Sequence, residues 1–462
     1  MTGGTFNRAV GKDRPGTYVN TESTRVNRVG AAERGTVLIP LPAHDYGPAN
    51  EFITIDSSAP DAQIDKLGYS VFDNHPSMLM IREAFKQASR VIVYIPRQGK
   101  RASAALEDAL MARARYGGTR GNSLSVSIIS NPVRGFDVTI YLDAVEVAVY
   151  EQLETANDLV KQTNTWIEFF EVEDYDHVSN LSAPLIPLAG VTLSGGSDGV
   201  LVVSDIITFL DKSEEISWNC LAFPFEASDE PDDPVPALQA AVIAKIRYFR
   251  EDVGRYRKAV LANNNNANFE GIINVTNSVV LQGGQRVSLA EVTAWVAGAD
   301  AGASNIQSNT HSVYAGAVEI IGAKNHIAAV QAIRNGEFFF SRSEAGEIKV
   351  EYDINSLTSF VFPKDESWRK NQVLRVLDTF AESLMLNFPP NRFKNRPSDW
   401  DVMEGLGRAE LTLFYNAGAI KDVNADDFLV DREASVDDRT YFNVGLSPVG
   451  SAEKLFFTVR TR

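Results

Sequence analysis

The side chains with the greatest chemical reactivity in this chain of 462 residues are five histidines and a single cysteine. The histidines are scattered and match neither an HExxH motif nor a facial triad, so we predict no metal ligand among them: His44, His75, His177, His311 and His326. Cys220 lies inside an apolar run, which favours a structural thiol over a nucleophile. We therefore predict no catalytic residue, no metal site and no cofactor.

The segment with the strongest resemblance to an enzyme site is Leu193–Gly199, with the sequence LSGGSDG. It follows a predicted strand and precedes a predicted helix, which is where phosphate-binding loops lie. Asp198 stands where a Walker loop needs a lysine, and its charge would repel phosphate. Turn glycines are the favoured interpretation. The alternative is a nucleotide-dependent cytosolic α/β enzyme that uses Gly195–Gly199.

The charge balance excludes two classes of partner. Lys and Arg number 44 against 60 Asp and Glu, a formal charge of −16. Bulk binding to nucleic acid or to an anionic membrane needs a cationic surface, so we predict neither partner. No apolar segment reaches the ~20 residues that span a bilayer. The first residues lack the apolar core of a secretory signal, which predicts a cytosol-like compartment.

The elements that must position these residues begin with an alternation of strand and helix. We predict strands at residues 36–41 and 91–95, a helix with one buried face at 78–88, and an Ala-rich helix at 102–115. Gly117 and Gly118 would end the last helix. This order indicates a parallel or mixed sheet with helices on its faces.

Period-2 patterns then indicate antiparallel strands. Apolar residues alternate with polar ones over 136–142 and again over 145–149, on either side of Asp143-Ala144. Further strand candidates lie at 124–128 and 166–170. We predict a small β-rich domain at 120–185, inserted into the α/β one.

The α/β pattern resumes near Val191. A helix is predicted at 204–212, a strand at 220–223, and a longer helix whose apolar stripe runs from Leu238 to Phe249. A basic run lies late in that helix, and we interpret it as a solvated face rather than a nucleic-acid site: Arg247, Arg250, Arg255, Arg257 and Lys258.

The two ends of the chain differ from the body. Residues 1–35 are polar, with a short extended piece at 15–20. After a strand at 347–354 and an amphipathic helix at 367–387, alternating segments occupy 442–446 and 455–461. The final apolar strand must pair with something, because an unpaired strand is an aggregation edge.

These patterns give a mixed α/β fold class and a domain order. The predicted units are an N-terminal arm (1–35), a first core segment (36–119), the inserted β-rich domain (120–185), a second core segment (186–345), a C-terminal α/β domain (346–440), and a final strand and arm (441–462).

Short motifs spread along the chain share the order of one known family. They are Gly3–Phe6, Arg14–Asn20, Arg34–Val37, Tyr46–Pro48, Ala114–Asn122, Leu193–Gly199, Glu270–Ile273, Ala294–Ala299, Val350–Phe360, Arg369–Arg375 and Glu453–Val459. In this order the sequence resembles the tail sheath proteins of contractile-tailed bacteriophages. The resemblance is strongest to the form in phages and phage-tail-like bacteriocins of Gram-positive bacteria.

The resemblance implies a structural subunit and no enzyme. Members of the family stack as hexameric rings around a tail tube, assemble with baseplate and tail terminator proteins in the bacterial cytoplasm, and contract to drive the tube through a cell envelope. It also implies that both arms complete sheets on neighbouring subunits. The implied arm contacts are Tyr18, Val19, Leu455, Phe457 and Val459.

The resemblance further implies a tube contact from the C-terminal domain. The candidates on the predicted helix at 367–387 are Arg369, Lys370 and Arg375, if the tube surface is acidic; a solvated helix face is the alternative. Besides the enzyme, a passive filament or shell protein with a single length state stays open as a competing function.

Overall fold

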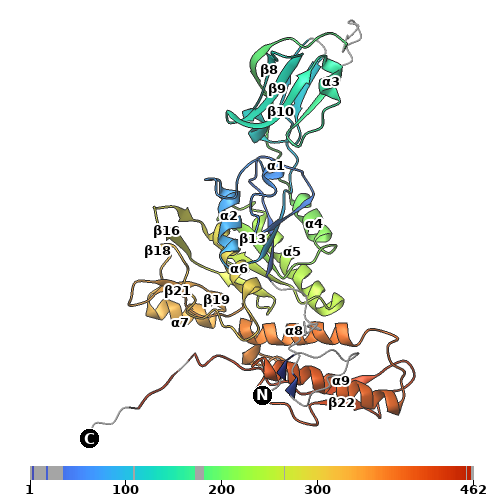
Figure 1. The fold of residues 1–462 in the computed structure, drawn as a ribbon. Helices are drawn as coiled ribbons and strands as arrows, with labels where there is room; N and C mark the ends of the chain where they lie inside the picture. The colour runs from blue at the N-terminus through green and yellow to red at the C-terminus, as the bar shows by residue number, and fades with distance from the viewer. Residues whose placement is uncertain are drawn as a thin grey trace.

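The computed structural model describes residues 3–4, 17–18, 35–107, 110–171, 182–264, 266–453 and 455–458. It shows three tiers: a β-rich domain at one end, an α/β core in the middle, and a helical C-terminal domain at the other end (Figure 1). No helix within the described ranges has the length and apolar character needed to cross a membrane.

The core is built on a seven-stranded sheet. Its strands are β3 (Thr36–Pro40), β4 (Phe52–Asp56), β5 (Arg90–Tyr94), β13 (Cys220–Glu226), β14 (Lys258–Ala262), β15 (Ile272–Val275) and β19 (Glu337–Phe338). They lie in the order β19-β15-β14-β13-β3-β5-β4. Every neighbouring pair is parallel except β4 with β5, which is antiparallel. The predicted mixed sheet is confirmed.

Helices cover both faces of this sheet (Figure 1). They are α1 (Ile64–Leu67), α2 (Pro76–Phe85), α4 (Val203–Lys212), α5 (Val235–Tyr248) and α6 (Leu289–Gly302). Side chains of β3 alternate between the two faces, because successive residues of a strand point in opposite directions. Val37 and Ile39 pack into the cluster that contains α2 and α6, and Leu38 packs into the cluster that contains α4 and α5.

The β-rich domain is a sandwich of two sheets. Its elements are β6 (Ser103–Ala105), β7 (Leu110–Ala114), β8 (Leu124–Ser130), β9 (Phe136–Leu142), β10 (Val145–Leu153), α3 (Ala156–Val160), β11 (Ile167–Glu171) and β12 (Leu188–Thr192). One sheet has the order β10-β9-β8-β12 and the other β11-β7-β6. Val126, Ile140 and Phe169 belong to the single apolar cluster of this domain. The predicted strands around Asp143-Ala144 are confirmed.

The prediction of an Ala-rich helix at 102–115 is wrong. This segment forms β6 and β7, and β7 pairs with β11 in antiparallel register. Leu110, Ala112 and Ala114 are buried while Met111 and Arg113 are half-buried, which is the period of a strand. Pairing with β11 outweighs the helix propensity of alanine.

Smaller sheets lie beside the core. Their elements are β16 (Ser278–Leu281), β17 (Arg286–Val287), β18 (Ala317–Ile321), α7 (His326–Arg334), β20 (Phe340–Arg342) and β21 (Ile348–Val350). The strand predicted at 347–354 is therefore shorter than expected. Beyond Val350 the chain turns inward, and the carboxylate of Asp353 becomes buried.

The C-terminal domain consists of two helices and a hairpin. Its elements are α8 (Asn371–Asn387), α9 (Pro397–Asn416), β22 (Phe428–Asp431) and β23 (Tyr441–Val444). A 3-10 turn at Glu366–Arg369 precedes α8, so the predicted helix at 367–387 is confirmed except for its first residues. Val376, Leu411 and Phe428 share one small apolar cluster.

Candidate assembly interface

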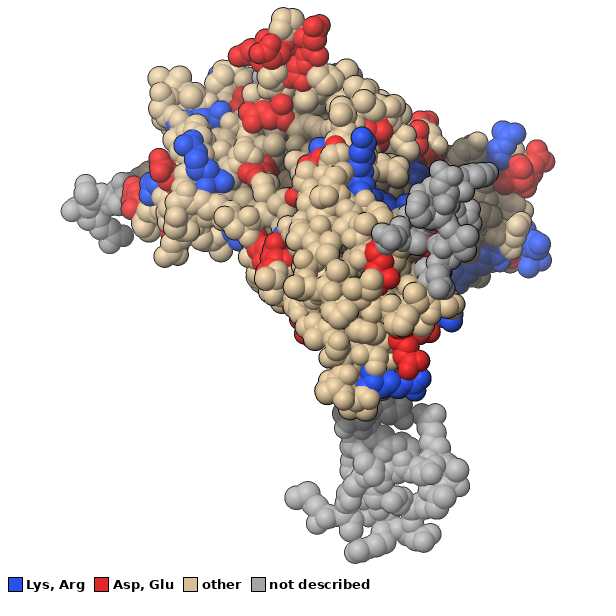
Figure 2. Space-filling model, turned by 90° about the horizontal axis from the view of Figure 1, so that it is seen from above, with Lys and Arg blue, Asp and Glu red and all other residues tan. Residues whose placement is uncertain are grey.

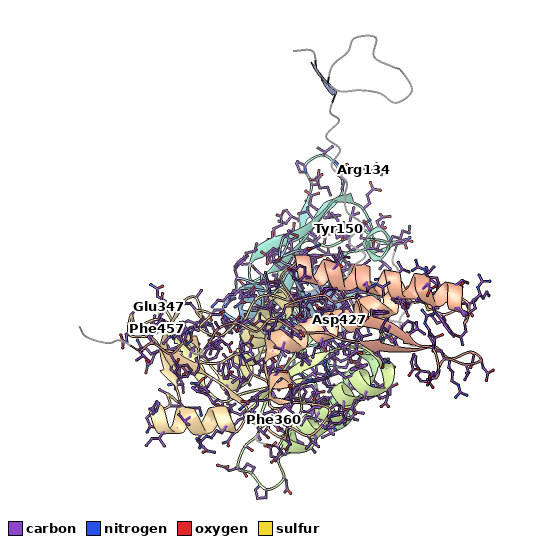
Figure 3. All side chains as sticks on the ribbon, turned by 90° about the horizontal axis from the view of Figure 1, so that it is seen from below. Arg134, Tyr150, Glu347, Phe360, Asp427 and Phe457 are labelled. Atoms are coloured by element: carbon purple, nitrogen blue, oxygen red, sulfur yellow. The ribbon has the colours of Figure 1, made fainter. Side chains whose placement is uncertain are left out.

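The C-terminal arm leaves the body as an extended chain with uncovered apolar side chains. Leu455, Phe456 and Phe457 are 67%, 92% and 83% exposed. The arm runs away from the body in Figure 1, and Figure 3 places Phe457 at the outer edge of the molecule. Residues 455–458 form no strand within this chain. Val459, another predicted arm contact, lies outside the described residues.

Just before the arm, a half-buried carboxylate fixes the point at which the chain leaves the body. Glu453 accepts a hydrogen bond from Lys370 Nζ at 2.8 Å, and its other oxygen accepts from the hydroxyls of Ser308 (3.0 Å) and Thr310 (2.8 Å). Burial raises the pKa of Glu453, but Lys370 and the hydroxyls together hold it below its ordinary value. We call Glu453 with these three partners the arm anchor. No pattern in the sequence marks it, because the partners are far apart along the chain.

Two short strands represent the N-terminal arm. β1 (Gly3–Gly4) and β2 (Thr17–Tyr18) pair in parallel, with Gly3 opposite Thr17. They stand clear of the body in Figure 3. The backbone of Tyr18 lies in β2, while its side chain and Val19 lie outside what the structure describes.

The hairpin β22–β23 offers edges on which further strands can pair. It is a sheet of two strands in the part of the chain that the structure describes, so each strand has one edge without a neighbouring strand. Phe428 and Val430 are buried against the rest of the domain, whereas Tyr441 and Val444 are 50% and 38% exposed. One face is therefore fixed. The backbone N–H of Val430 in β22 is buried and donates to Oε1 of Glu404 at 3.0 Å, whereas β23 is mostly exposed, so β23 offers the more accessible edge.

The three predicted tube-facing cations differ in their surroundings. Arg375 is fully buried, donating to Asp300 at 2.6 Å and to Asp353 at 3.1 Å, so its guanidinium offers no surface to a partner. This corrects the prediction for Arg375. Arg369 is 8% exposed, and Lys370 belongs to the arm anchor.

The basic run also departs from the prediction of a solvated face. Arg250, Arg257 and Lys258 are all buried. Arg250 forms a two-point ion pair with Asp378 of α8, at 2.9 and 2.7 Å. Arg257 donates to the backbone oxygens of Ser213 and Ile216. These cations join the C-terminal domain to the core and organise loops inside it.

Surface charges on the face at the inserted-domain end are interspersed, with basic and acidic side chains separated by uncharged areas (Figure 2). That view shows no continuous basic patch over the described residues it displays. The distribution agrees with the excess of acidic residues in the chain.

The glycine loop at 193–199 is a joint between the core and the inserted domain. The backbone oxygen of Ser197 accepts from Lys100 N at 2.8 Å, and Ser103 N donates to Ser194 O at 2.9 Å. A Cβ at Gly199 would collide with the backbone oxygen of Gln98, so the glycine is required by close backbone contact. Asp198 accepts from Thr119 N at 2.8 Å. Ser194, Ser197 and Asp198 of the loop thus form hydrogen bonds with other segments of the same chain.

A sandwich domain inserted in an α/β core, together with a C-terminal arm whose described apolar side chains are exposed, fits a structural subunit that assembles with other copies of itself. Family models cover nearly all of the chain. They are the "Tail sheath protein Gp18 domain III N-terminal region" (34–94), the "Phage tail sheath protein beta-sandwich domain" (97–198), the "Phage tail sheath protein central domain" (199–356) and the "Phage tail sheath C-terminal domain" (363–462).

Two relatives from Bacillus subtilis match over the full length. The uncharacterized protein YqbK is 34% identical over 100% of both chains, and the phage-like element PBSX protein XkdK is 34% identical over 99% of both. Among solved structures, the sheath tail protein from Desulfitobacterium hafniense has a TM-score of 0.80 at 31% identity, covering 97% of this chain and 100% of its own.

More distant structures share the fold. The helical sheath of the anti-feeding prophage in its contracted state has a TM-score of 0.54 at 13% identity, covering 98% of this chain and 100% of its own. The chain belongs to the phage tail sheath family, whose models match it from residue 34 to residue 462, and is a tail sheath subunit. The alternative of a nucleotide-dependent enzyme has no support, and the glycine loop has a structural explanation.

Proposed function

We propose that this chain polymerises as stacked hexameric rings around a tail tube, and that its arms join the rings by pairing with the β22–β23 hairpins of neighbouring copies. The observation that carries the proposal is the combination of exposed arm residues 455–457 with a hairpin whose two edges lack a neighbouring strand among the described residues. An added strand would pair with the exposed backbone of β23, and alternate side chains would set the register.

The arm anchor separates a part of the chain that is fixed on the body from a part that can pair with a neighbouring copy. Glu453 is held by Lys370, Ser308 and Thr310, so the chain is fixed up to this residue and extended beyond it. A subunit could then rotate about the exit point while its arm stays paired to a neighbour. Retained arm pairing would keep the polymer connected when its length changes.

Contraction without a bound nucleotide needs a free-energy difference between two arrangements of the same subunits. At roughly 25 cal/mol per Å² of apolar surface, a few hundred additional buried Å² per subunit would supply several kcal/mol. Summed along a tail, that energy would drive a tube through an envelope. A passive filament, the competing function, would show one length state.

Deleting residues 455–462 tests the arm. We expect a folded monomer by circular dichroism that forms no sheath polymers in negative-stain micrographs. A matched pair of substitutions separates the arm from general surface change: Phe457→Asp should impair polymerisation, whereas Phe72→Asp, 69% exposed on the core, should not. Normal sheaths from the deletion variant would exclude the proposal.

Tube contact is proposed for the C-terminal domain, with Lys370 as the main remaining candidate, because its side chain is 28% exposed whereas Arg369 is buried. Lys370→Glu should weaken decoration of purified tubes if the tube surface is acidic. Glu453→Gln is the control, because it disturbs the arm anchor without changing the charge at position 370. Equal decoration by wild type and Lys370→Glu would remove Lys370 from the tube contact.

The sheath is proposed to be part of a phage tail or of a phage-tail-like device that is assembled in the bacterial cytoplasm, with baseplate and terminator proteins at its ends.

A further inference from the structure

Two histidines that are 31 positions apart come together beside an aspartate where the inserted domain joins the core. The ligand atoms of His44, Asp45 and His75 all lie within 4.8 Å of one another. His44 and Asp45 are on the loop after β3, and His75 immediately precedes α2.

His44 is oriented as a metal ligand would be. Its side chain is buried, and Nε2 lies 3.0 Å from the backbone oxygen of Leu67. An oxygen acceptor there requires a hydrogen on Nε2, which leaves a lone pair on Nδ1. That Nδ1 atom is buried and has no hydrogen-bond partner. Metal-bound histidines commonly donate their other ring N–H to a backbone carbonyl in this way.

Asp45 resembles His44 in that one of its side-chain atoms has a hydrogen-bond partner and the other has none. Its Oδ2 accepts a hydrogen bond from the hydroxyl of Tyr69 at 2.9 Å. Its Oδ1 is buried without a hydrogen-bond partner and lies 3.6 Å from Nε2 of His75. Oδ1 of Asp45 and Nδ1 of His44 are therefore two buried acceptor atoms close to each other. Burying both is costly unless a proton or a cation lies between them.

His75 forms the side of the cluster that is open to solvent. Its ring stacks on Tyr69 with 4.5 Å between centroids, and its side chain is 16% exposed. Nδ1 accepts a hydrogen bond from Ser77 N at 3.2 Å and caps α2. Coordination through Nε2 would move the ring hydrogen to Nδ1, so metal binding would replace the cap hydrogen bond with a metal–nitrogen bond.

We propose that His44 Nδ1, Asp45 Oδ1 and His75 Nε2 bind one divalent transition cation of the zinc class. Two imidazoles and a carboxylate suit such an ion, and a water would complete a tetrahedral site on the exposed side. The ion would tie the loop after β3 to the start of α2, at the base of the inserted domain.

Titration of the full-length chain with Zn²⁺ by calorimetry tests the site. We expect one equivalent to bind, with affinity roughly a hundredfold or more lower in His75→Gln and in Asp45→Asn. The matched control is His326→Gln, because His326 is an exposed histidine at the start of α7 and should leave the affinity unchanged. Absence of saturable binding, or equal affinity in wild type and both site variants, would overturn the proposal.

A second measurement covers variants that fail to fold. Co²⁺ added to the wild-type chain should give the intense visible absorption bands of tetrahedral coordination, and one equivalent of Zn²⁺ should remove them. Only the weak spectrum of octahedral, water-coordinated Co²⁺ would contradict the site, whatever the variants do. Adding Zn²⁺ should also speed hydrogen exchange at the amide of Ser77, because the cap acceptor is lost.

Discussion

At the scale of single residues, buried charges hold the C-terminal domain on the core. Arg375 bonds to Asp300 and Asp353, and Lys258 bonds to Asp300 at 3.0 Å. Two cations face two carboxylates, so the charges of the group balance. Such a group adds little to the free energy of unfolding. Removing any one member lowers that free energy strongly, because its partner stays buried and unpaired.

Removing Asp378 should show this penalty most clearly. Asp378→Ala leaves the guanidinium of Arg250, whose side chain is 5% exposed, without its two-point partner, and should cost about 3–5 kcal/mol in the free energy of unfolding. The exposed pair of Arg90 with Asp56 is the control, since Asp56→Ala should cost about 1 kcal/mol or less. Urea unfolding followed by fluorescence measures both. An equal loss of unfolding free energy in both variants would show that burial does not strengthen the Arg250–Asp378 pair.

The arm anchor predicts a pH-dependent release of the arm. The pKa of Glu453 is held below its ordinary value, so the anchor's stabilisation is complete above that value and is lost as the pH falls through the lowered pKa. Glu453→Gln should remove about 1 kcal/mol, the contribution of a half-buried charged hydrogen bond, which is roughly a fivefold change. Proteolysis of the chain around residues 449–453 should therefore be about fivefold faster at pH 7.

Once the pH falls below the lowered pKa of Glu453, the same measurement should show the variant and the wild type converging, because the wild-type carboxyl is then protonated. Glu347→Gln, at an exposed position (Figure 3), should behave as wild type at both pH values. A constant difference between Glu453→Gln and wild type down to low pH would contradict the account of the anchor.

Charged residues show the limit of sequence reasoning at this scale. Arg247 and Arg250 look alike in the sequence, yet Arg250 is buried against Asp378, a carboxylate 128 positions away. The proximity of His44 and His75 was missed for the same reason, since only the fold brings the two segments together. Spacing along the chain predicts clusters only when their members share one element.

At the scale of elements, periodicity predicted most strands and helices correctly. The alternation over 136–149 marked β9 and β10, and Asp143 and Ala144 between them both have positive φ, as a tight turn requires. It failed at β7, where small alanines mask the alternation and long-range pairing decides the structure. The predicted final strand at 455–461 forms no strand over its described residues 455–458, so its pairing with a neighbouring copy stays a prediction.

A pair of glycines in α9 tests how this helix packs. A Cβ at Gly407 would overlap the ring of Phe428, while a Cβ at Gly405 meets nothing within 4 Å. Gly407→Ala should destabilise the C-terminal domain by about 1–3 kcal/mol through overpacking. Gly405→Ala should stabilise it by up to about 1 kcal/mol through helix propensity. Thermal unfolding measures both, and the same sign for both would contradict the observed packing of α9 on β22.

At the scale of the whole molecule, the features that matter for assembly lie at the periphery. The inserted domain and the C-terminal domain occupy opposite ends of the core, and the C-terminal arm extends beyond the body (Figure 1). Each domain has its own apolar cluster, and the exposed arm residues 455–457 lie outside these clusters. This arrangement suits a polymer whose subunits change orientation while remaining connected.

The most direct test of the arm exchange is disulfide cross-linking between copies. The single native cysteine, Cys220, is buried, so we expect disulfides only between the introduced cysteines. Chains carrying Phe457→Cys are mixed with chains carrying Tyr441→Cys or Val444→Cys, assembled and oxidised. Val133→Cys, 81% exposed in the inserted domain, replaces the hairpin cysteine as the control. We predict covalent dimers between arm and hairpin variants in assembled sheaths and none with the control; assembled sheaths in which neither hairpin cysteine cross-links to the arm would contradict the account.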